Sequence, residues 1–396
     1  MSLPLEGVRI LAVEQYGAGP FGTQHLADLG AEVIKIENPL EGGDVGRKVG
    51  PFFFDEGDSH FYQSFNRNKK SITLNLKHPD GIAVLRELAR TADAVFNNLR
   101  GDLPAKLGLD YESLRDVNPR IVCVHLSAYG RQGERTKWPG YDYLMQAEAG
   151  YLSLTGEPDG PPARFGISII DMMTGTMSAL ALTSAVLGAR TTGVGRDMDV
   201  SLFDVAMHNL NYLAAWYLNE KEVTTRQPRS AHPSLTPSQL YRTKDGWLFI
   251  MCNKEKFFGV LAEAVGKPEW ATDPRFVDFA ARLKNREALT AELDAALMTE
   301  TTQTWLERLG GTVPIAPVYD IAQALDNPFV HSQGLIVESE HEKRGTIRTM
   351  ACPIRCTGEE LPKVRAPKLG EHTEEVLSTL GSDAAWLQAL RENKVI

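Results

Sequence analysis

A glycine motif near the start of the chain could bind a phosphate. The hexapeptide GAGPFG fits the pattern GxGxxG at Gly17, Gly19 and Gly22, after the apolar run VRILAV. A second run, AEVIKIE, ends in the acid Glu37. Backbone N–H groups at such a strand-to-helix turn bind the phosphates of dinucleotides. Pro20 removes one of these donors. A tight strand-to-helix turn that needs glycine is the alternative, and the motif alone is a weak signal for a nicotinamide cofactor.

Cations and amides are concentrated around the strands expected in the first half of the chain. The segments FNRNKKSITLNL and NNLRGDLPAKLGL, with two later cations, contain Asn66, Arg67, Asn68, Lys69, Lys70, Asn97, Asn98, Arg100, Lys106, Arg135 and Lys137. In a doubly wound sheet the carboxyl ends of the strands form the ligand crevice. These side chains could bind a polyanion through charge-assisted hydrogen bonds. A solvated surface is the alternative.

An aspartate in the middle of the chain could act as a nucleophile. In ARFGISIIDMMTGTMSAL, Asp171 ends an apolar run and begins a long helical pattern. It could simply cap that helix. Alternatively, its carboxylate lies at the mouth of the sheet. With an ordinary pKa of about 3.9 it would be ionised at neutral pH and could attack an activated acyl group without a general base.

Alternating strands and helices are expected to position these side chains. Over the first 200 residues, the runs VRILAV, AEVIKI, DAVFNN and RIVCVHLSA alternate with helical patterns, one of them from about Pro79 to Thr91. This alternation predicts an α/β fold with a mostly parallel sheet and helices on its faces. Two long apolar helices are expected to follow, over residues 171–189 and 201–217.

The character of the sequence changes after Asn219. The polar, proline-bearing segment KEVTTRQPRSAHPSLTPSQ indicates a linker or an active-site loop, and YRTKDGWLFIMCN predicts a hairpin that turns at Asp245 and Gly246. Amphipathic helices follow to about Leu325. Strands return at LIVESE and GTIRTMACPIRCTG, and a final helix begins near Glu371.

These changes predict two domains. We expect a large α/β domain built from both chain ends, residues 1–220 and 330–396, with a smaller α+β domain inserted at 225–325.

Composition indicates a globular protein with a sizeable core, because 43% of its 396 residues are hydrophobic and 23% are charged. The net charge of −9 disfavours nucleic acid or an anionic membrane as the main partner. The first residues lack the pattern of a signal peptide, and no window is expected to approach a membrane span, so we expect a cytoplasmic protein. The cysteines lack CxxC spacing and are expected to be reduced core residues, not a disulfide or zinc site: Cys123, Cys252, Cys352 and Cys356.

Several segments together resemble the class III CoA-transferases. In order, they are LEGVRIL, AGPFGTQHLADLGAEVIKIE, FNRNKKSITLNL, GYDYLMQAEAG, GISIIDMMTG, GRDMDVSLFDVAMHNL and RAPKLGEHTEEVL. The resemblance runs from Leu5 to the C-terminal helix and is far more specific than GxGxxG. It implies a CoA-binding Rossmann-like domain and an interlocked homodimer in which each chain is an open ring threaded by the other. It also implies acyl-CoA and a carboxylic acid as substrates, with no metal and no permanently bound cofactor.

The resemblance also implies roles for residues at matching positions. Asp171 falls where the family keeps its catalytic aspartate. Lys106 stands where a relative can have arginine, so a single contact would replace a forked one. Backbone N–H groups near Ala18 and after Asn219 are candidates for stabilising an oxyanion. The expected CoA-binding residues are Ala18, Lys35, Asn98, Arg100, Lys106, Lys137 and Tyr141.

The reaction implied is a ping-pong acyl transfer through a mixed anhydride and an aspartyl-CoA thioester on Asp171. The alternative is a 2-methylacyl-CoA racemase or epimerase, because those enzymes are homologous to the family. Racemases of this type carry a histidine directly before the aspartate of the GYD-like segment, where this chain has Tyr141 before Asp142. A tyrosine with an ordinary pKa of about 10 is a poor base at neutral pH, which favours the transferase.

Two departures from formyl-CoA transferase bear on the acceptor acid. That enzyme has glutamine at the position of Gly17 and a run of glycines where this chain has RSAHPSLTPSQLY, so formate and oxalate are not expected. The latter segment could close over the acceptor or be an ordinary interdomain loop. Arginines could hold a distal carboxylate, so we expect a dicarboxylic acceptor with succinyl-CoA as donor. The expected substrate-binding residues are Gly17, Arg47, Arg67, Arg164 and His232.

Overall fold

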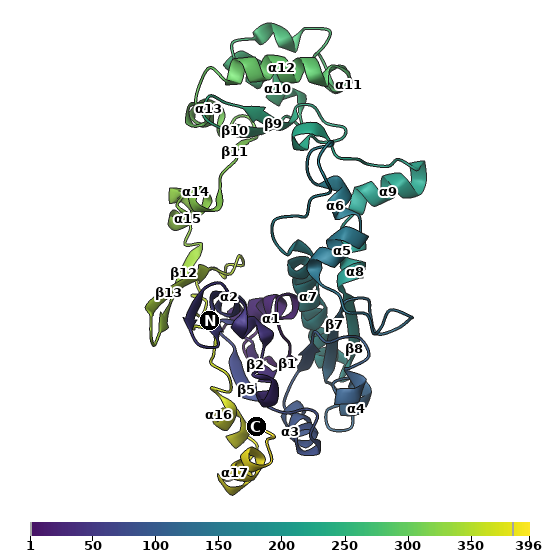
Figure 1. Cartoon of the computed structure of the whole chain (residues 1–396), viewed down its shortest axis with the longest axis vertical. Helices are drawn as coiled ribbons and strands as arrows, with labels where there is room; N and C mark the ends of the chain where they lie inside the picture. Colours follow the sequence, from purple (N-terminus) through teal and green to yellow (C-terminus); the bar gives the residue numbers. More distant parts are fainter. Residues whose placement is uncertain (1, 382–383) are drawn as a thin grey trace. The chain divides into compact units, whose positions relative to one another are not determined.

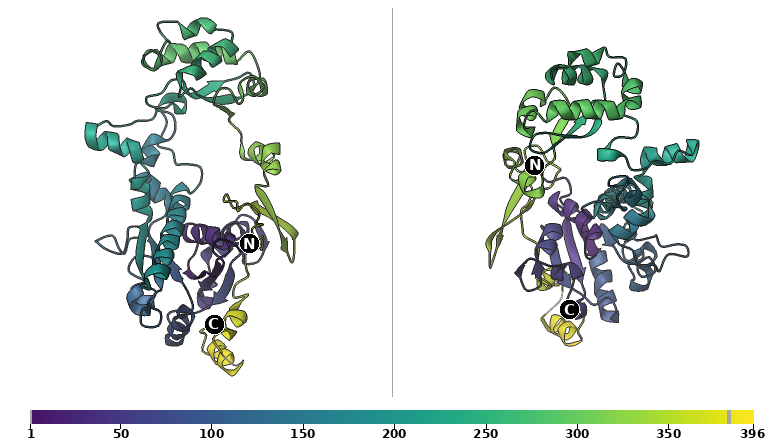
Figure 2. Two further views of the ribbon diagram at one scale, coloured as in Figure 1. Left: turned by 180° about the vertical axis from the view of Figure 1, so that it is seen from behind. Right: turned by 45° about the horizontal axis from the view of Figure 1, so that its top comes forward.

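The computed structural model describes residues 2–381 and 384–396, which form two compact units. Both ends of the chain, purple and yellow in Figure 2, belong to the first unit. The predicted boundaries differ from these units at residues 150–165 and 212–220, which pack with the second unit. The first unit comprises Met1–Ala149, Gly166–Asn211 and His331–Ile396, and the second comprises Gly150–Phe165 and Tyr212–Val330.

A six-stranded parallel sheet forms the centre of the first unit (Figure 1). The strand order is β5-β2-β1-β6-β7-β8, which is the Rossmann order. The first three of these strands in the chain are added toward one edge of the sheet and the next three toward the other, so the order reverses between β1 and β6. The predicted parallel sheet is therefore confirmed. Its strands are β1 (Arg9–Val13), β2 (Glu32–Glu37), β5 (Lys70–Thr73), β6 (Ala94–Asn97), β7 (Val122–Ser127) and β8 (Arg196–Ser201).

The central strands form because they are nearly continuous apolar runs, as expected for parallel strands covered on both faces. Leu11, Ile34 and Val95 are at most 1% exposed. Strands β5 and β8 lie at the two edges of the sheet and were not predicted, because their sequences KSIT and RDMDVS are largely polar. They become strands because they form backbone hydrogen bonds with β2 and β7, respectively, and the sequence alone does not show this pairing.

Helices α1 (Ala18–Asp28) and α7 (Ile169–Thr192) pack against each other (Figure 1). A Cβ atom added to Gly22 would lie 2.4 Å from the backbone oxygen of Gly175, so neither glycine can gain a side chain without moving the helices apart. The final glycine of the GxGxxG pattern therefore serves helix packing. Helix α3 (Pro79–Ala89) begins at its proline, as predicted.

The length and composition of helix α7 contradict the expectation that no segment approaches a membrane span. Its 24 residues are long and apolar enough to cross a bilayer by length and composition alone. The helix also packs on α1 and on strands β7 and β8, and core helices of soluble proteins share this composition. The single helix predicted over 201–217 is two helices, α8 (Leu202–His208) and α9 (Asn211–Glu220), because the backbone turns to a φ of +46° at Asn211.

The first unit has further elements outside the six-stranded sheet. The two strands expected near the C-terminal end pair as an antiparallel hairpin, and two helices end the chain. These elements are β3 (Phe53–Asp55), β4 (Asp58–Ser59), α2 (His60–Asn66), α4 (Tyr111–Leu114), α5 (Asp142–Glu148), β12 (Ile336–His341), β13 (Gly345–Met350), α16 (Thr373–Ser378) and α17 (Ala384–Glu392), with 3₁₀ helices at Pro39–Glu41, Val45–Lys48 and Ala105–Leu107.

The second unit has its own core around a three-stranded antiparallel sheet in the order β11-β10-β9. The predicted hairpin is present as β9 (Ser238–Arg242) and β10 (Trp247–Met251), and Tyr241 and Leu248 are fully buried between the sheet and its helices. The other elements are α6 (Tyr151–Leu154), α10 (Glu255–Ala264), α11 (Phe279–Lys284), α12 (Arg286–Leu297), α13 (Thr302–Leu309), β11 (Ile315–Pro317) and α14 (Ile321–Leu325), with 3₁₀ helices at Pro228–Ser230 and Pro268–Ala271. The boundary with the first unit falls within α15 (Pro328–Ser332), after Val330.

Candidate active site

A cavity of about 210 Å³ opens at the carboxyl ends of β1, β6 and β7, next to the point where the strand order reverses. This is the position at which doubly wound sheets bind their ligands. All of its lining belongs to the first unit: Gln15, Tyr16, Gly17, Ala18, Asn98, Leu99, Arg100, Leu126, Ser127, Ala128, Trp138, Pro139, Gly140, Tyr141, Asp171 and Leu202.

Asp171 supplies the carboxylate of this cavity. It is the third residue of α7, and the helix begins after Ser168 without a side-chain cap, so Asp171 is not the capping residue that the sequence left as an alternative. Only 8% of Asp171 is exposed, and among the described residues nothing donates a hydrogen bond to its carboxylate. A buried carboxylate without a donor or a cation is unusual, which marks Asp171 as a functional candidate.

A second carboxylate lies beside Asp171. Asp142 is the first residue of α5; its Oδ2 accepts a hydrogen bond from the backbone N–H of Asp171 at 3.0 Å, and its Oδ1 accepts one from Gln146 at 2.5 Å. Burial, together with the smaller effect of the Asp142 charge, raises the pKa of Asp171 to about 7. The expectation of an ordinary pKa near 3.9 is therefore wrong, because the sequence does not show how deeply the carboxylate is buried.

Each glycine of the GxGxxG pattern has its own close neighbour. A Cβ added to Gly17 would lie 2.9 Å from Oδ2 of Asp171, and one added to Gly19 would lie 2.9 Å from Cγ of Asn98. Both distances are shorter than side chains tolerate. The motif therefore brings the start of α1 close to Asp171 on one side and to the end of β6 on the other.

Five of the predicted ligand residues line the cavity: Gly17, Ala18, Asn98, Arg100 and Tyr141. The amide of Asn98 accepts from the backbone N–H of Gln15 at 2.9 Å and donates to the Gln15 carbonyl at 2.7 Å. Among the described residues that line the cavity, Arg100 is the one with a positively charged side chain. Its guanidinium forms an ion pair with Asp102 at 2.6 Å. Tyr141 is 63% exposed, so its ring is accessible to a ligand.

Two predicted lysines lie just outside the lining. Lys106 binds Asp102 at 2.8 Å, the carboxylate that also binds Arg100, and it is well exposed. Lys137 is exposed and directly precedes Trp138, whose side chain is part of the lining. Both ammonium groups are on the surface, where a large anion that extends from the cavity could contact them.

Lys35 has structural partners. It is fully buried, its ammonium lies 2.8 Å from Oδ2 of Asp44, and it donates to the carbonyl of Glu14 at 3.0 Å. Its charge is neutralised inside the protein, so the predicted contact with CoA receives no support from the structure.

Two of the arginines predicted to hold the acceptor are also committed to structure. Arg47 binds Glu37 through two hydrogen bonds of 2.8 and 2.7 Å, and Arg67 binds Asp28 through bonds of 2.9 and 2.5 Å. Both guanidinium groups are almost fully buried. Neither lines the cavity, so neither supports the predicted pairing with a distal carboxylate. The sequence shows cations but not the carboxylates that come to face them.

The other two predicted substrate residues belong to the second unit. Arg164 donates to the carbonyl of Phe165 at 3.0 Å. His232 accepts from the backbone N–H groups of Ser234 and Leu235 at 3.1 and 3.2 Å, and burial lowers its pKa. Their roles toward a substrate remain predictions.

Sequence reasoning missed Tyr16 and Trp138 as lining residues, and it used Asp142 only to distinguish a racemase from a transferase. Tyr16 has a φ of +68°, which is uncommon for a residue other than glycine. Its ring contacts the Tyr141 ring edge-on at 6.4 Å between centroids. The position of Tyr16 directly before the GxGxxG pattern, between β1 and α1, was the available signal.

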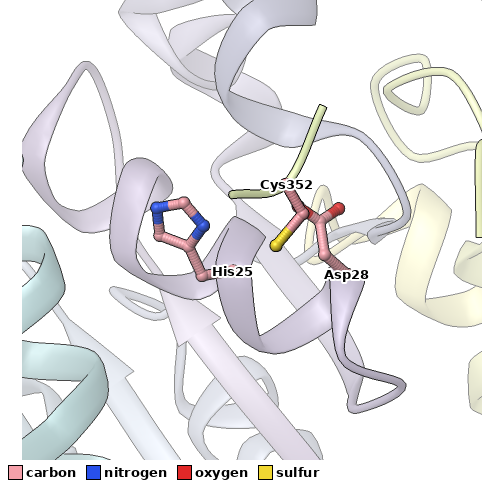
Figure 3. A group of neighbouring side chains, drawn as sticks. All are labelled: His25, Asp28 and Cys352. Atoms are coloured by element: carbon pink, nitrogen blue, oxygen red, sulfur yellow. The ribbon is translucent and has the colours of Figure 1, made fainter. Parts of the chain in front are cut away.

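One group of possible metal ligands occurs in the part of the chain that the structure describes: His25, Asp28 and Cys352, with ligand atoms within 4.8 Å of one another. Figure 3 shows the Cys352 side chain pointing toward the two α1 residues from another segment. Both oxygens of Asp28 already accept hydrogen bonds from Arg67, and one also accepts from Asn68 at 2.7 Å. The adjacent guanidinium would repel a metal ion, so these contacts explain the group without one. The described cysteines are free, and three of the four are buried.

Comparison with known proteins agrees with this geometry. The model of CoA-transferase family III matches residues 5–373. The chain is 36% identical to a succinate–glutarate CoA-transferase of Agrobacterium fabrum over 95% of this chain and 96% of that protein. It is also 36% identical to an acetyl-CoA:oxalate CoA-transferase of Acetobacter aceti over 93% of each. A crystal structure of a CAIB/BAIF family protein from Brucella suis matches with a TM-score of 0.83 at 33% identity, over 96% of this chain and 100% of that one.

A match over nearly the whole chain, together with a carboxylate at the ligand-binding end of a Rossmann-ordered sheet, identifies the protein: the chain belongs to CoA-transferase family III and is a CoA-transferase.

Proposed function

We propose that the enzyme moves CoA from an acyl-CoA thioester, with succinyl-CoA as donor, to a small dicarboxylic acid through covalent intermediates on Asp171. The observation that carries the proposal is the buried Asp171 carboxylate, which lines the cavity and accepts no hydrogen bond from the described residues. Its lone pairs are therefore free to form a bond to carbon. The relatives named for glutarate and oxalate support a dicarboxylic acceptor.

The proposed reaction has four acyl transfers. The Asp171 carboxylate attacks the thioester carbon and expels CoA thiolate, which leaves a mixed anhydride. The thiolate then attacks the aspartyl carbonyl, forming an aspartyl-CoA thioester and releasing the donor acid. The acceptor carboxylate attacks that thioester and again expels CoA thiolate, and the thiolate finally attacks the acceptor acyl carbon. The last step forms the new acyl-CoA and restores the Asp171 carboxylate.

The raised pKa of Asp171 suits this role. A carboxylate with a pKa of about 7 is a stronger nucleophile than an ordinary one, yet a substantial fraction is ionised at neutral pH. Each attack produces a tetrahedral oxyanion, which must be stabilised by donors. The backbone N–H of Ala18, at the start of α1, is our candidate donor within the cavity.

The proposed CoA contacts follow the cavity lining outward. Asn98, Arg100 and Tyr141 lie on the lining, and Lys106 and Lys137 are exposed beside it. The three cations would neutralise phosphate groups.

The experiment is covalent trapping. The enzyme is mixed with succinyl-CoA, treated with borohydride or hydroxylamine, digested and analysed by mass spectrometry, and modification at Asp171 is expected. Asp171→Asn should show no modification and should lose at least about 10³-fold in turnover, because the nucleophile is gone. Asp204→Asn changes a first-turn aspartate of α8 that lies outside the cavity lining and is the matched control. Undiminished turnover by Asp171→Asn would rule out the proposal.

The acceptor is tested by a panel of acids read as thioesters by mass spectrometry, including glutarate, succinate, malate, mesaconate, formate and oxalate. The sequence argued against oxalate, but a relative named for oxalate transfer is 36% identical, so oxalate belongs in the panel. The racemase alternative is tested by exchange of the substrate α-proton in deuterated buffer. The relatives named above are transferases, which favours transfer.

We also propose that the enzyme is a homodimer, interlocked as the family resemblance implies, and that it is cytoplasmic. Leu180 and Leu187 on α7 are 60% and 69% exposed in the single chain, which supports a further protein surface over this helix. Light scattering should give twice the mass of 43.7 kDa.

A further inference from the structure

The turn between β1 and α1 forms one wall of the cavity and has a strained backbone. Gln15, Tyr16 and Gly17 all line the cavity, and Tyr16 adopts a φ of +68°. This conformation is unfavourable for a tyrosine, so the surrounding structure must hold it. Gly17, the next residue, faces Oδ2 of Asp171. A change at Tyr16 would therefore move the backbone that contacts the proposed nucleophile.

Three side chains hold this turn by its backbone. Asn98 binds both the N–H and the carbonyl of Gln15. Asp44 Oδ1 accepts from the backbone N–H of Tyr16 at 2.9 Å. Lys35 donates to the carbonyl of Glu14 at 3.0 Å. Asn98 lines the cavity, whereas Asp44 and Lys35 hold the turn from inside the protein.

Both carboxylate oxygens and the backbone N–H of Asp44 have close partners of their own. Its Oδ1 also accepts from the backbone N–H of Gly46 at 2.7 Å, its own N–H donates to Glu37 at 2.9 Å, and its Oδ2 lies 2.8 Å from the Lys35 ammonium. Asp44 is 3% exposed and Lys35 is fully buried. A buried ion pair contributes little net stability compared with apolar side chains, so its use here calls for a reason other than stability.

We propose that Asp44, oriented by its ion pair with Lys35, is a positioning residue for the transferase reaction. It holds the N–H of Tyr16 and so fixes the strained turn that places Gly17 against Asp171. Because neither Asp44 nor Lys35 lines the cavity, both act through the turn. The inference rests on the proposed role of Asp171 as nucleophile.

The test separates the hydrogen bond from the ion pair. Lys35→Met/Asp44→Asn removes both charges but keeps an acceptor oxygen for the Tyr16 N–H. Lys35→Met/Asp44→Leu removes both charges and the acceptor. We expect kcat of the double variant with Asp44→Leu to fall at least about tenfold below that of the double variant with Asp44→Asn, because the reacting groups are misplaced. KM for succinyl-CoA should change less than about threefold, because the proposed CoA contacts outside the turn remain: Arg100, Lys106, Lys137 and Tyr141. Rescue by asparagine is the expected signature of positioning.

The control is a buried ion pair that does not contact the turn. Arg67→Met/Asp28→Leu removes a similarly buried ion pair. If this variant folds, its kcat should be close to the kcat of the wild type. If the variant with Asp44→Leu does not fold, Lys35→Met/Asp44→Ala takes its place in the comparison. Crystal structures of the folded variants should show a changed φ at Tyr16 only where the acceptor is absent.

Equal kcat for the folded acceptor-lacking variant and the asparagine variant would overturn the proposal. An unchanged φ at Tyr16 in the acceptor-lacking variant would overturn it as well. Failure of the proposed function is distinguishable, because it would appear as active enzyme without modification of Asp171, whatever the Asp44 variants show.

Discussion

Two buried carboxylates of the first unit have opposite electrostatic surroundings. Glu37, at the end of β2, is 3% exposed and accepts two hydrogen bonds from Arg47, one from Ser71 and one from the backbone of Asp44. Asp171, at the start of α7, is 8% exposed and has a second carboxylate, Asp142, as its neighbour.

The same burial therefore gives opposite shifts. Burial raises the pKa of Glu37, but the hydrogen bonds and charge of Arg47, together with the charge of Lys35 and the Ser71 hydrogen bond, outweigh it, and the net pKa is lowered. For Asp171, burial and Asp142 act in the same direction and raise the pKa to about 7. A buried carboxylate with every lone pair occupied is committed to its structural partners, and a carboxylate left without donors is available for chemistry. Partners, not burial, separate the structural group from the reactive one.

The largest stability effect is expected at the paired carboxylate. Glu37→Gln leaves the buried Arg47 guanidinium without a counter-charge, which should lower the free energy of unfolding by about 3–5 kcal/mol, measured by urea denaturation at pH 7. Glu338→Gln removes an exposed partner of Arg348 and should cost less than about 1 kcal/mol. An equal loss of unfolding free energy in Glu37→Gln and Glu338→Gln would show that burial of the ion pair at Glu37 makes no difference.

The raised pKa of the unpaired carboxylate Asp171 should make the free energy of unfolding fall as pH rises. The lowered pKa of Glu37 acts in the opposite direction. An unfolded aspartate titrates near pH 4, whereas folded Asp171 titrates near pH 7, so the folded state binds more protons between these values. The wild type should therefore lose up to roughly 4 kcal/mol of unfolding free energy as pH rises from about 4 to 7. Asp171→Asn should lack this loss, so its stability advantage should grow from pH 5 to pH 8. An advantage that stays constant would show that Asp171 has an ordinary pKa.

The contact between Gly17 and Asp171 is expected to affect activity more than stability. In Gly17→Ala, the new methyl group would lie 2.9 Å from the Asp171 carboxylate and displace it, so kcat should fall about 10- to 100-fold. Gly259→Ala, on α10, adds a methyl group where no described atom lies within 4 Å and should leave kcat unchanged. Steady-state kinetics of the two variants compare a glycine at the site with one in open space. Similar kcat values would mean that Asp171 does not depend on the turn.

The smallest effect is expected from the neighbouring carboxylate. Asp142→Asn keeps an oxygen for the Asp171 N–H but removes the negative charge, so the pKa of Asp171 should fall. The acidic limb of the kcat profile should move to lower pH by less than about one unit, because burial is the larger cause of the raised pKa. Glu148→Gln, in the last turn of α5, should leave the profile in place. A shift to higher pH would contradict the assigned electrostatics.

The family, the parallel sheet and the position of the nucleophile candidate followed from the sequence alone. Apolar runs alternating with helical patterns predict buried parallel strands, and the ordered motifs fix Asp171 as the candidate nucleophile. Gly17, Ala18, Asn98, Arg100 and Tyr141 were also predicted as ligand residues, and they line one cavity because they follow strands that end at the same edge of the sheet.

Only the tertiary structure decided which charges are neutralised. Lys35, Arg47 and Arg67 have the same side-chain chemistry as an anion-binding cation, but Asp44, Glu37 and Asp28 come to face them in the folded chain. The same holds for Asp171, whose pKa depends on the atoms that bury it and on Asp142, 29 residues away. Residue type sets what a side chain can do, but desolvation and charge pairing act through space, and they determine what it does here.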